Sequence, residues 1–298
     1  MSHPLEIPRL RRSVLSVPAI NQRALEKTHA LDCDVVIFDL EDSVAVEKKA
    51  EARDNLRRFF KHTPLSGRET VIRINALDSD FVADDLELVH ALAPDVVALP
   101  KVNDASCIKR LEAQLDGASL QTRIWAMMET ACGITNSIEI AKSGKSADGR
   151  LDCFVIGLND LRKDTGVPAR PGRAYLVPWM MQVVLAARAH GLGVIDSVFN
   201  DFRDRQALEE ECVQGRDMGF DGKMLIHPDQ VEIANHVFGP SPEAIEEAKA
   251  VIAAFSRPEA RDLNVVTMDG HMVERLHLEQ AEKLVAQISL IEKRGKPA

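Results

Sequence analysis

Short runs of apolar, largely β-branched residues recur along this chain of 298 residues, and their spacing most constrains its fold. The runs are SVLSV at 13–17, DVVIFDL at 34–40, TVIRI at 70–74, DVVALP at 95–100, RIWAMME at 123–129, LDCFVIGL at 151–158, GVIDS at 193–197 and GFDGKMLI at 219–226. Most are continuously apolar rather than alternating, which is typical of strands buried on both faces of a parallel sheet. Each run is therefore predicted to be a buried strand.

Segments between these runs place apolar residues three or four apart with charged residues between them, as amphipathic helices do. QRALEKTHAL, DDLELVHAL and RQALEEECVQGRDMG are examples. Eight strands alternating with helices over roughly 230 residues predict a (β/α)8 TIM barrel, whose usual size is about 250 residues. A doubly wound open sheet is the alternative, but no GxGxxG motif follows the first run.

The pattern changes at Gly239. The segment GPSPEAIEEAKAVIAAF predicts a helix with Ser241 as its N-cap and Pro242 in its first turn. A polar stretch follows, and then a last amphipathic helix from about Val273 to Ile291. We therefore expect a barrel with a short N-terminal arm over residues 1–238 and a helical extension over residues 239–298.

Composition and charge exclude several classes of protein. A net charge of −9 argues against non-specific binding to nucleic acid or to an anionic membrane surface. Five scattered cysteines without a CxxC pair argue against a disulfide framework or a thiolate zinc site. The start, MSHPLEIPRLRR, lacks the apolar segment of a secretory signal, and the longest uncharged run, 174–187, is too short to cross a bilayer. We expect a cytoplasmic protein.

Polar side chains follow the apolar runs where the predicted strands end. They are Asp39, Glu41, Asp42, Arg73, Asn75, Lys101, Glu129, Asn159, Asp160, Asp196 and His227. Active sites of (β/α)8 barrels lie at the C-terminal ends of the strands. Charges of both signs that converge there are expected where a small anion binds, so the sequence predicts such a site in the barrel mouth.

Glu129 and Asp160 are predicted to bind a metal ion. They end the neighbouring strands five and six, and adjacent parallel strands lie about 4.8 Å apart, so both carboxylates could reach one ion. Two carboxylates with open positions suit Mg²⁺, which prefers oxygen ligands. The alternative is that Glu129 caps the helix that is expected to start near Ile134.

Other residues at the strand ends allow two interpretations each. Arg73 could hold a carboxylate in bidentate fashion, or it could form a salt bridge with Asp39 or Glu41. Asp39 and Glu41 could orient metal-bound waters or cap the next helix. For Asp42 we favour the helix cap. Lys101 could attract an anionic substrate or pair with a neighbouring acid.

Several stretches of the chain resemble, in the same order, the citrate lyase β-subunit-like (HpcH/HpaI aldolase) family, which includes the malyl-CoA and citramalyl-CoA lyases. The matching stretches are RRSVLSVPA, VVIFDLEDSVAVEKKAEAR, VIRIN, VVALPKV, METACGITNSIEIA, FVIGLNDLRKD, GFDGKMLIHPDQ and DGHMVE. No single motif decides the resemblance, but together the stretches cover nearly the whole chain.

This resemblance implies a (β/α)8 barrel that binds Mg²⁺, or Mn²⁺ in its place, through Glu129 of MET and Asp160 of NDL. It also implies that Arg73 of RIN contacts the carboxylate or the oxygen of a 2-oxo acid. Family members typically make or break a carbon–carbon bond between a 2-oxo acid and an acetyl-CoA unit, and they assemble as trimers or hexamers. In some of them a lid from a neighbouring subunit adds a catalytic aspartate.

Two motifs depart from the family pattern. The PGSR-like turn after the first strand has Asn21 in place of the arginine that would meet CoA phosphates. Lys27, which matches a basic position of the family, could compensate, and Arg12 could anchor a CoA phosphate or a substrate carboxylate. The family's DGxMxD reads DGHMVE here, so Glu274 stands where the lid aspartate would be.

The reaction implied by the resemblance is cleavage of a malyl-CoA- or citramalyl-CoA-like thioester to a 2-oxo acid and acetyl-CoA. The metal ion and Arg73 would stabilise charge on the oxygen that becomes the ketone, and Glu274 of another subunit would protonate the enolate. Asp39 and Glu41 are further candidates for catalytic residues. Hydrolysis of the thioester at the same metal site is one alternative. A non-catalytic barrel that binds an acyl-CoA or a carboxylate is another.

Overall fold

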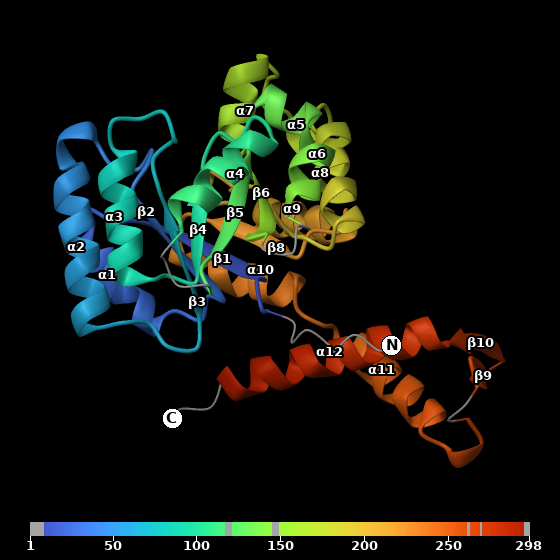
Figure 1. Ribbon diagram of the computed structural model, residues 1–298. Coiled ribbons are helices and arrows are strands. Elements are labelled where there is room, and N and C mark those ends of the chain that lie inside the picture. The colour runs from blue at the N-terminus through green and yellow to red at the C-terminus, as the bar shows by residue number, and fades with distance from the viewer. Residues whose placement is uncertain (1–8, 117–120, 145–148, 261–262, 269, 295–298) are drawn as a thin grey trace. The chain divides into compact units, whose positions relative to one another are not determined.

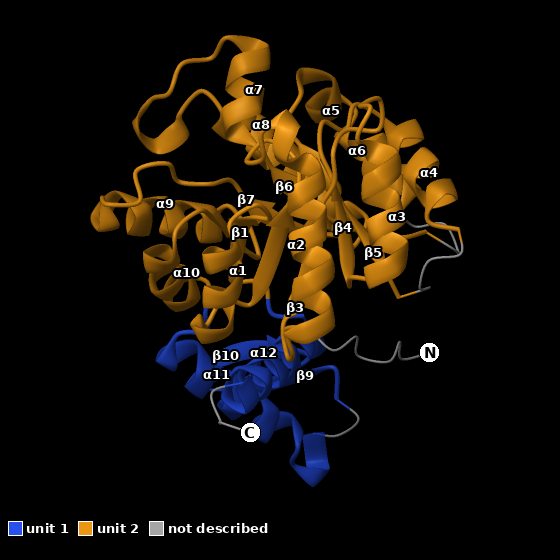
Figure 2. Cartoon of the chain, turned by 90° about the vertical axis from the view of Figure 1, so that its left-hand side faces the viewer, with its two compact units in different colours: residues 1–10, 239–298 blue, residues 11–238 orange. Residues whose placement is uncertain are grey.

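The computed structural model describes residues 9–116, 121–144, 149–260, 263–268 and 270–294. The chain divides into two compact units, one of residues 11–238 and one that combines residues 1–10 with residues 239–298 (Figure 2). Each unit has an apolar core of its own. The predicted N-terminal arm lies largely outside the described residues.

Residues 11–238 form a closed barrel of eight parallel strands within the described ranges, surrounded by helices (Figure 1). The strands are β1 (Ser13–Pro18), β2 (Val35–Asp39), β3 (Glu69–Arg73), β4 (Val96–Leu99), β5 (Arg123–Met128), β6 (Leu151–Ile156), β7 (Gly193–Asp196) and β8 (Gly222–Leu225). They pair in chain order, and β8 pairs with β1 to close the sheet. The predicted (β/α)8 barrel is confirmed, and an open sheet is excluded.

Helices connect these strands or follow the last of them. They are α1 (Gln22–Lys27), α2 (Lys49–His62), α3 (Val82–Leu92), α4 (Ala105–Gln114), α5 (Ala131–Thr135), α6 (Ser137–Ser143), α7 (Leu158–Thr165), α8 (Val177–Ala189), α9 (Arg205–Asp217) and α10 (Val231–Val237), with the short 3-10 helices η1 (Thr28–Ala30), η2 (Val46–Lys48), η3 (Pro171–Arg173) and η4 (Pro228–Gln230). Of these, η4 and α10 follow β8. Asp104 and Asp204 cap α4 and α9 by accepting N–H groups that would otherwise lack partners. No helix in the described ranges is long and apolar enough to cross a membrane.

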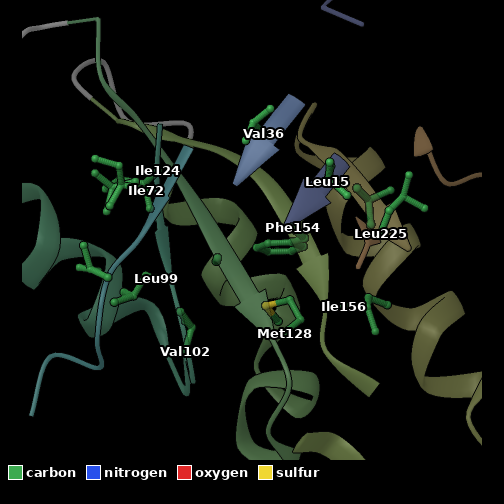
Figure 3. Close-up of a cluster of buried hydrophobic side chains, with 14 of the residues drawn as sticks. Leu15, Val36, Ile72, Leu99, Val102, Ile124, Met128, Phe154, Ile156 and Leu225 are labelled. Atoms are coloured by element: carbon green, nitrogen blue, oxygen red, sulfur yellow. The ribbon is translucent and has the colours of Figure 1, made fainter. Parts of the chain in front are cut away.

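The barrel buries two apolar layers, because successive side chains of a strand point to opposite faces. One layer contains only strand residues and fills the barrel; it consists of Val14, Val35, Ile37, Val71, Val96, Ala98, Trp125, Met127, Cys153, Val155, Ile195 and Met224. The other lies between the strands and the helices and includes Leu15, Val36, Ile72 and Phe154 (Figure 3). Burial on both faces explains why the strands are continuously apolar.

One predicted boundary is wrong in a way that matters for the site. The apolar run 151–158 does not form a single strand, because β6 ends at Ile156 and Leu158 already begins α7. An apolar run by itself does not distinguish the end of a buried strand from the buried first turn of the next helix. Asp160 therefore lies on a helix and not at the end of a strand.

The C-terminal unit contains α11 (Pro242–Phe255), η5 (Pro258–Ala260), the antiparallel strands β9 (Val265–Met268) and β10 (His271–Glu274), and α12 (Arg275–Arg294). Ser241 caps α11 as predicted. The hairpin was not predicted, and the last helix begins at Arg275 rather than Val273 because Val273 pairs with Val266. Gly270, with φ of +80°, belongs to the connection between the two strands. The role of this unit as a lid stays a prediction.

Gly222 in the closing strand β8 meets the backbone that enters β1. A Cβ atom at this position would lie 1.8 Å from the carbonyl oxygen of Arg11. That backbone is also held by the N–H of Lys223, which donates to the carbonyl of Arg12 at 3.1 Å. We expect Gly222→Ala to lower the free energy of unfolding in urea by about 1–3 kcal/mol through overpacking. Unchanged stability would contradict this close approach.

Candidate active site

A cavity of about 430 Å³ is lined by residues from the C-terminal ends of the barrel strands and the loops that follow them. Its polar lining residues are Ser16, Asp39, Asp42, Ser43, Arg73, Glu129, Asn159, Asp160, Ser197 and Asn200. The structure thus brings Asp39, Arg73, Glu129 and Asp160 together at one cavity, at the end of the barrel where the sequence predicts a site.

Strand alternation explains why two of these side chains face the cavity. Val71 and Met127 lie in the layer that fills the barrel. Arg73 and Glu129 follow them by two residues, so they point to the same side of the sheet. Because they come at the ends of their strands, they reach the mouth of the barrel and not its packed interior.

Glu129 is a deeply buried acid, with only 1% of its surface exposed. Its Oε1 atom accepts the backbone N–H of Lys101 at 2.8 Å. Burial is the largest influence and raises the pKa of Glu129 to about 7; the Lys101 hydrogen bond and the charge of Arg73 oppose this rise, and the charge of Asp160 adds to it. A buried carboxylate of this kind is stabilised by a proton or by a bound cation.

The alternative role of Glu129 as a helix cap is excluded. Thr130 caps α5, because its side chain accepts the N–H of Gly133 at 2.9 Å. Space for Glu129 is instead provided by Gly157, the residue after β6. A Cβ atom on Gly157 would lie 2.3 Å from Oε2 and 2.6 Å from Cβ of Glu129. The constraint is steric, since φ of −109° at this glycine is open to any residue.

Asp160 is the third residue of α7, half-buried, and it lines the cavity. Glu129 lines the same cavity, and the negative charge of Asp160 adds to the rise in the pKa of Glu129. Across the described part of the chain we find no hydrogen-bond or ion-pair partner for the Asp160 carboxylate. Its oxygens are therefore available to a ligand.

Arg73 forms a salt bridge with both acids that were considered for it. Its Nε and Nη2 atoms donate to the two oxygens of Asp39 at 2.6 and 2.7 Å, and Nη1 lies 3.1 Å from Oε2 of Glu41. Burial is the largest single influence and would raise the pKa of Asp39, but the charge and hydrogen bonds of Arg73, together with hydrogen bonds from Ser43 and Glu41, lower this pKa overall. Arg73 still lines the cavity, where it has further N–H groups to offer a substrate.

Lys101 has φ of +53°, a left-handed conformation that is uncommon for a residue with a side chain. In this conformation its N–H is bonded to Glu129, while its ammonium group pairs with Glu41 and lies 3.6 Å from Asp42. Of its two interpretations, the structure therefore shows the pairing with acids. The predicted capping role of Asp42 is wrong, because no side chain caps η2 or α2.

Three predicted site residues lie elsewhere. Arg12 precedes β1, at the opposite end of the barrel, and its guanidinium forms a bidentate salt bridge with Asp34 at 2.9 Å. Residues before a parallel strand lie at the end away from the cavity, so Arg12 does not reach a substrate carboxylate there, and its predicted contact with a CoA phosphate stays a prediction. Lys27 ends α1 and is exposed outside the cavity lining. Glu274 ends β10 in the other unit, and its role stays a prediction.

The polar end of β7 faces away from the mouth. Asp196 is completely buried between strands and helices, where Nη1 of Arg173 and Nζ of Lys223 donate to it at 2.6 and 2.9 Å. The next residue, Ser197, lines the cavity. The sequence does not single out Ser197, because the run GVIDS ends in two polar residues and does not show which of them points inward.

This cavity fits a divalent cation. Its two nearby acids supply oxygen ligands, and one of them is a buried carboxylate with a pKa of about 7. Among the described residues no group of three or more His, Cys, Asp or Glu side chains could hold a metal ion. Two protein carboxylates with the remaining positions left to water or substrate is an arrangement that Mg²⁺ commonly adopts.

We expect Gly157→Ala to weaken Mg²⁺ binding by at least about tenfold, because the added methyl group would push the Glu129 carboxylate out of position. Isothermal titration calorimetry of the metal-free protein measures this change. Gly144→Ala is the matched control, since a Cβ there would also be crowded, at 3.0 Å from Leu151, but away from the cavity lining. Equal Mg²⁺ affinity in both variants would contradict the steric role of Gly157.

We expect the stability of the metal-free protein to fall as the pH rises from about 4.5 to about 7. The pKa of Glu129 is raised from 4.5 to about 7 on folding, so in this window the folded state keeps a proton that the unfolded state has lost. The free energy of unfolding should drop by about 3 kcal/mol. Urea denaturation in EDTA measures it, and Glu129→Gln should remove this part of the pH dependence. If the free energy of unfolding depends on pH in the same way in the wild type and in Glu129→Gln, the raised pKa does not belong to Glu129.

Residues 12–228 match the family described as HpcH/HpaI aldolase/citrate lyase. Over 280 residues, 94% of this chain and 95% of the relative, the sequence is 44% identical to a (3S)-malyl-CoA thioesterase of Cereibacter sphaeroides. It is 32% identical over 305 residues to the mitochondrial citramalyl-CoA lyase of Homo sapiens, covering 98% of this chain and 89% of that protein. It is 30% identical over 289 residues to the citrate lyase β subunit of Escherichia coli K12, covering 95% and 94%.

Solved structures agree with these relatives. The protein CitE of Mycobacterium tuberculosis, in complex with magnesium, acetoacetate and coenzyme A, has a TM-score of 0.73 at 31% identity and covers 93% of this chain and 97% of its own. The citrate lyase β subunit of the same organism, complexed with oxaloacetate and magnesium, has a TM-score of 0.67 at 32% identity and covers 78% and 100%. As its motifs predict, the chain belongs to the HpcH/HpaI aldolase/citrate lyase family of enzymes.

Proposed function

We propose that this enzyme is a Mg²⁺-dependent carbon–carbon lyase that acts on a malyl-CoA- or citramalyl-CoA-like thioester and yields a 2-oxo acid and acetyl-CoA. The observation that carries the proposal is the buried Glu129, with its pKa of about 7, at the same cavity as Asp160 and the fixed guanidinium of Arg73. The cavity thus combines a site for a cation with a fixed positive charge, which suits a small hydroxy acid.

Glu129 and Asp160 would hold the metal ion, Mg²⁺ or Mn²⁺, through carboxylate oxygens. When bound there, such an ion supplies Lewis acidity and orients a substrate that has neighbouring oxygen atoms. The Lys101 N–H and the space at Gly157 hold Glu129 in place for this role. The carboxylate of Asp160 has no competing partner among the described residues.

In the proposed cleavage, the substrate hydroxyl passes its proton to solvent water while the adjacent carbon–carbon bond breaks. The oxygen becomes the ketone of the 2-oxo acid, and the electron pair of the bond passes to the enolate of acetyl-CoA, which then takes up a proton. Arg73 donates its remaining N–H groups to the oxygen on which charge develops. Asp39 and Glu41 keep the guanidinium oriented, so they act by positioning Arg73.

We assign protonation of the enolate to Glu274 from a neighbouring subunit of a homo-oligomer, a trimer or a hexamer. The support is its position in the DGHMVE motif, where the family has the lid aspartate. The side chain of Glu274 is one methylene longer than that of aspartate. A comparison of the wild type with Glu274→Asp would show whether this added length matters. Lys27 is our candidate for contact with CoA phosphates.

Thioester hydrolysis is the second candidate function. It is favoured by sequence identity: four (3S)-malyl-CoA thioesterases of Cereibacter sphaeroides are 43–44% identical to this chain, whereas the lyases compared above are 30–32% identical. The same carboxylates and Arg73 would bind the malyl part of the substrate. The thioester carbonyl would then be attacked by water, giving a free acid and the thiol of CoA.

We expect incubation with Mg²⁺ and a panel of hydroxy-dicarboxylic acyl-CoA thioesters to release a 2-oxo acid without free thiol. Separate assays of oxo acid and thiol distinguish the two reactions, because hydrolysis releases thiol without oxo acid. Glu129→Gln and Asp160→Asn should each lower kcat by about 10³-fold or more, because metal-assisted charge stabilisation is lost. Release of neither product would contradict both functions.

The matched control for these variants is Asp164→Asn. Asp164 lies on α7 as well, but it is exposed and accepts the N–H of Ala131. It should keep most of the activity. If Glu129→Gln or Asp160→Asn keeps activity near that of the wild type, the metal assignment is wrong.

A further inference from the structure

We propose that Ser197 is a positioning residue for metal binding, which fixes Asp160 by holding the first turn of α7. The inference rests on the proposed metal role of Glu129 and Asp160. Ser197 is not bonded to Arg73 or to the carboxylate of Glu129. Its role would explain how Asp160, a metal ligand on a helix, keeps a fixed position.

The two metal acids are held in different ways. The carboxylate of Glu129 is buried, accepts the N–H of Lys101 and presses against Gly157. The carboxylate of Asp160 is half-exposed and has no such partner among the described residues. Its position therefore depends on the backbone that carries it, which is the first turn of α7.

That turn is bound to the segment after β7 at two successive residues. Oγ of Ser197 accepts the N–H of Leu158, the first residue of α7, at 3.0 Å. The side-chain amides of Asn159 and Asn200 bond to each other in both directions, at 2.9 and 3.2 Å. Leu158 and Asn159 directly precede Asp160, so both bonds act on the turn that presents its carboxylate.

Ser197 is itself held by a buried ion network. Its N–H donates to Oδ1 of Asp196 at 2.8 Å. Asp196 in turn accepts from Arg173 and from Lys223, and all three of these charged side chains are buried. Ser197 is also only 1% exposed. The hydroxyl that holds α7 therefore belongs to a residue that is bonded to a buried network of three charged side chains.

The Ser197 hydroxyl matters because the first N–H groups of a helix have no partner within the helix. Without it, the Leu158 N–H would be a buried donor without an acceptor, which is costly, and the turn is expected to shift or fray to reach water. A shift of this turn moves Asp160 relative to Glu129. Loss of groups that orient metal ligands typically weakens metal affinity 10- to 100-fold.

Calorimetric titration of the purified, metal-free full chain with MgCl₂ tests the proposal. We expect Ser197→Ala to weaken Mg²⁺ binding about tenfold, and kcat of this variant to recover at saturating Mg²⁺. Ser197→Thr keeps the hydroxyl and should bind Mg²⁺ within about threefold of the wild type. Asn200→Ala, a change at an exposed residue that should not affect folding, should weaken binding by a smaller factor and carries the test if Ser197→Ala does not fold.

Ser13→Ala is the matched control. Ser13 is equally buried, and its Oγ also accepts a backbone N–H, that of Asp34, at 3.0 Å, but it lies at the opposite end of the barrel. It should lower the stability and leave Mg²⁺ affinity unchanged. Equal Mg²⁺ affinity in the wild type, Ser197→Ala and Asn200→Ala would overturn the role of Ser197 but not the proposed metal site. Wild-type affinity in Glu129→Gln and Asp160→Asn overturns the proposed metal site, and the inference with it.

Discussion

The burial of one carboxylate, that of Glu129, organises the whole mouth of the barrel. A charge removed from water needs a compensating charge or a proton. Arg73, whose charge acts on Glu129, is already paired with Asp39 and Glu41, and the ammonium of Lys101 is paired with Glu41. Among the described residues Glu129 accepts a hydrogen bond only from the neutral N–H of Lys101, so its carboxylate is left to a proton or to an external cation. The surrounding cations are paired with other acids and do not neutralise it.

Much of this arrangement could be predicted from the sequence. Strands buried on both faces must be continuously apolar, so they can be recognised in the sequence. The number and spacing of these runs predict the (β/α)8 barrel. An ionisable residue directly after such a strand must leave the apolar layer, and in a parallel barrel all strands end on one side. For that reason Arg73 and Glu129 could be assigned to one site before any geometry was known, and family motifs supported the same residues.

Side-chain direction, the boundary between β6 and α7 and the partner of Arg12 could not be predicted, because the hydropathy pattern does not contain them. A strand that is apolar on both faces does not reveal which of two successive polar residues points inward, so the sequence favours Asp196 although Ser197 faces the cavity. An apolar stretch that continues from a strand into a buried helix start hides the boundary, so the sequence predicts Asp160 at a strand end although it lies on α7. Arg12 was a candidate because it is basic, but its partner Asp34 is set by the pairing of β1 with β2, at the far end of the barrel.

Lys101 shows how a site of this kind constrains improvement of the enzyme. A left-handed backbone costs a residue with a Cβ atom about 1 kcal/mol or more relative to glycine. Glycine would relieve that strain, yet it would remove the ammonium group that neutralises Glu41. Replacement of Lys101 by glycine would therefore have two opposite effects on stability, because it lowers backbone strain and removes a charge partner of Glu41. Directed evolution of this enzyme would meet these opposed effects in the loop after β4.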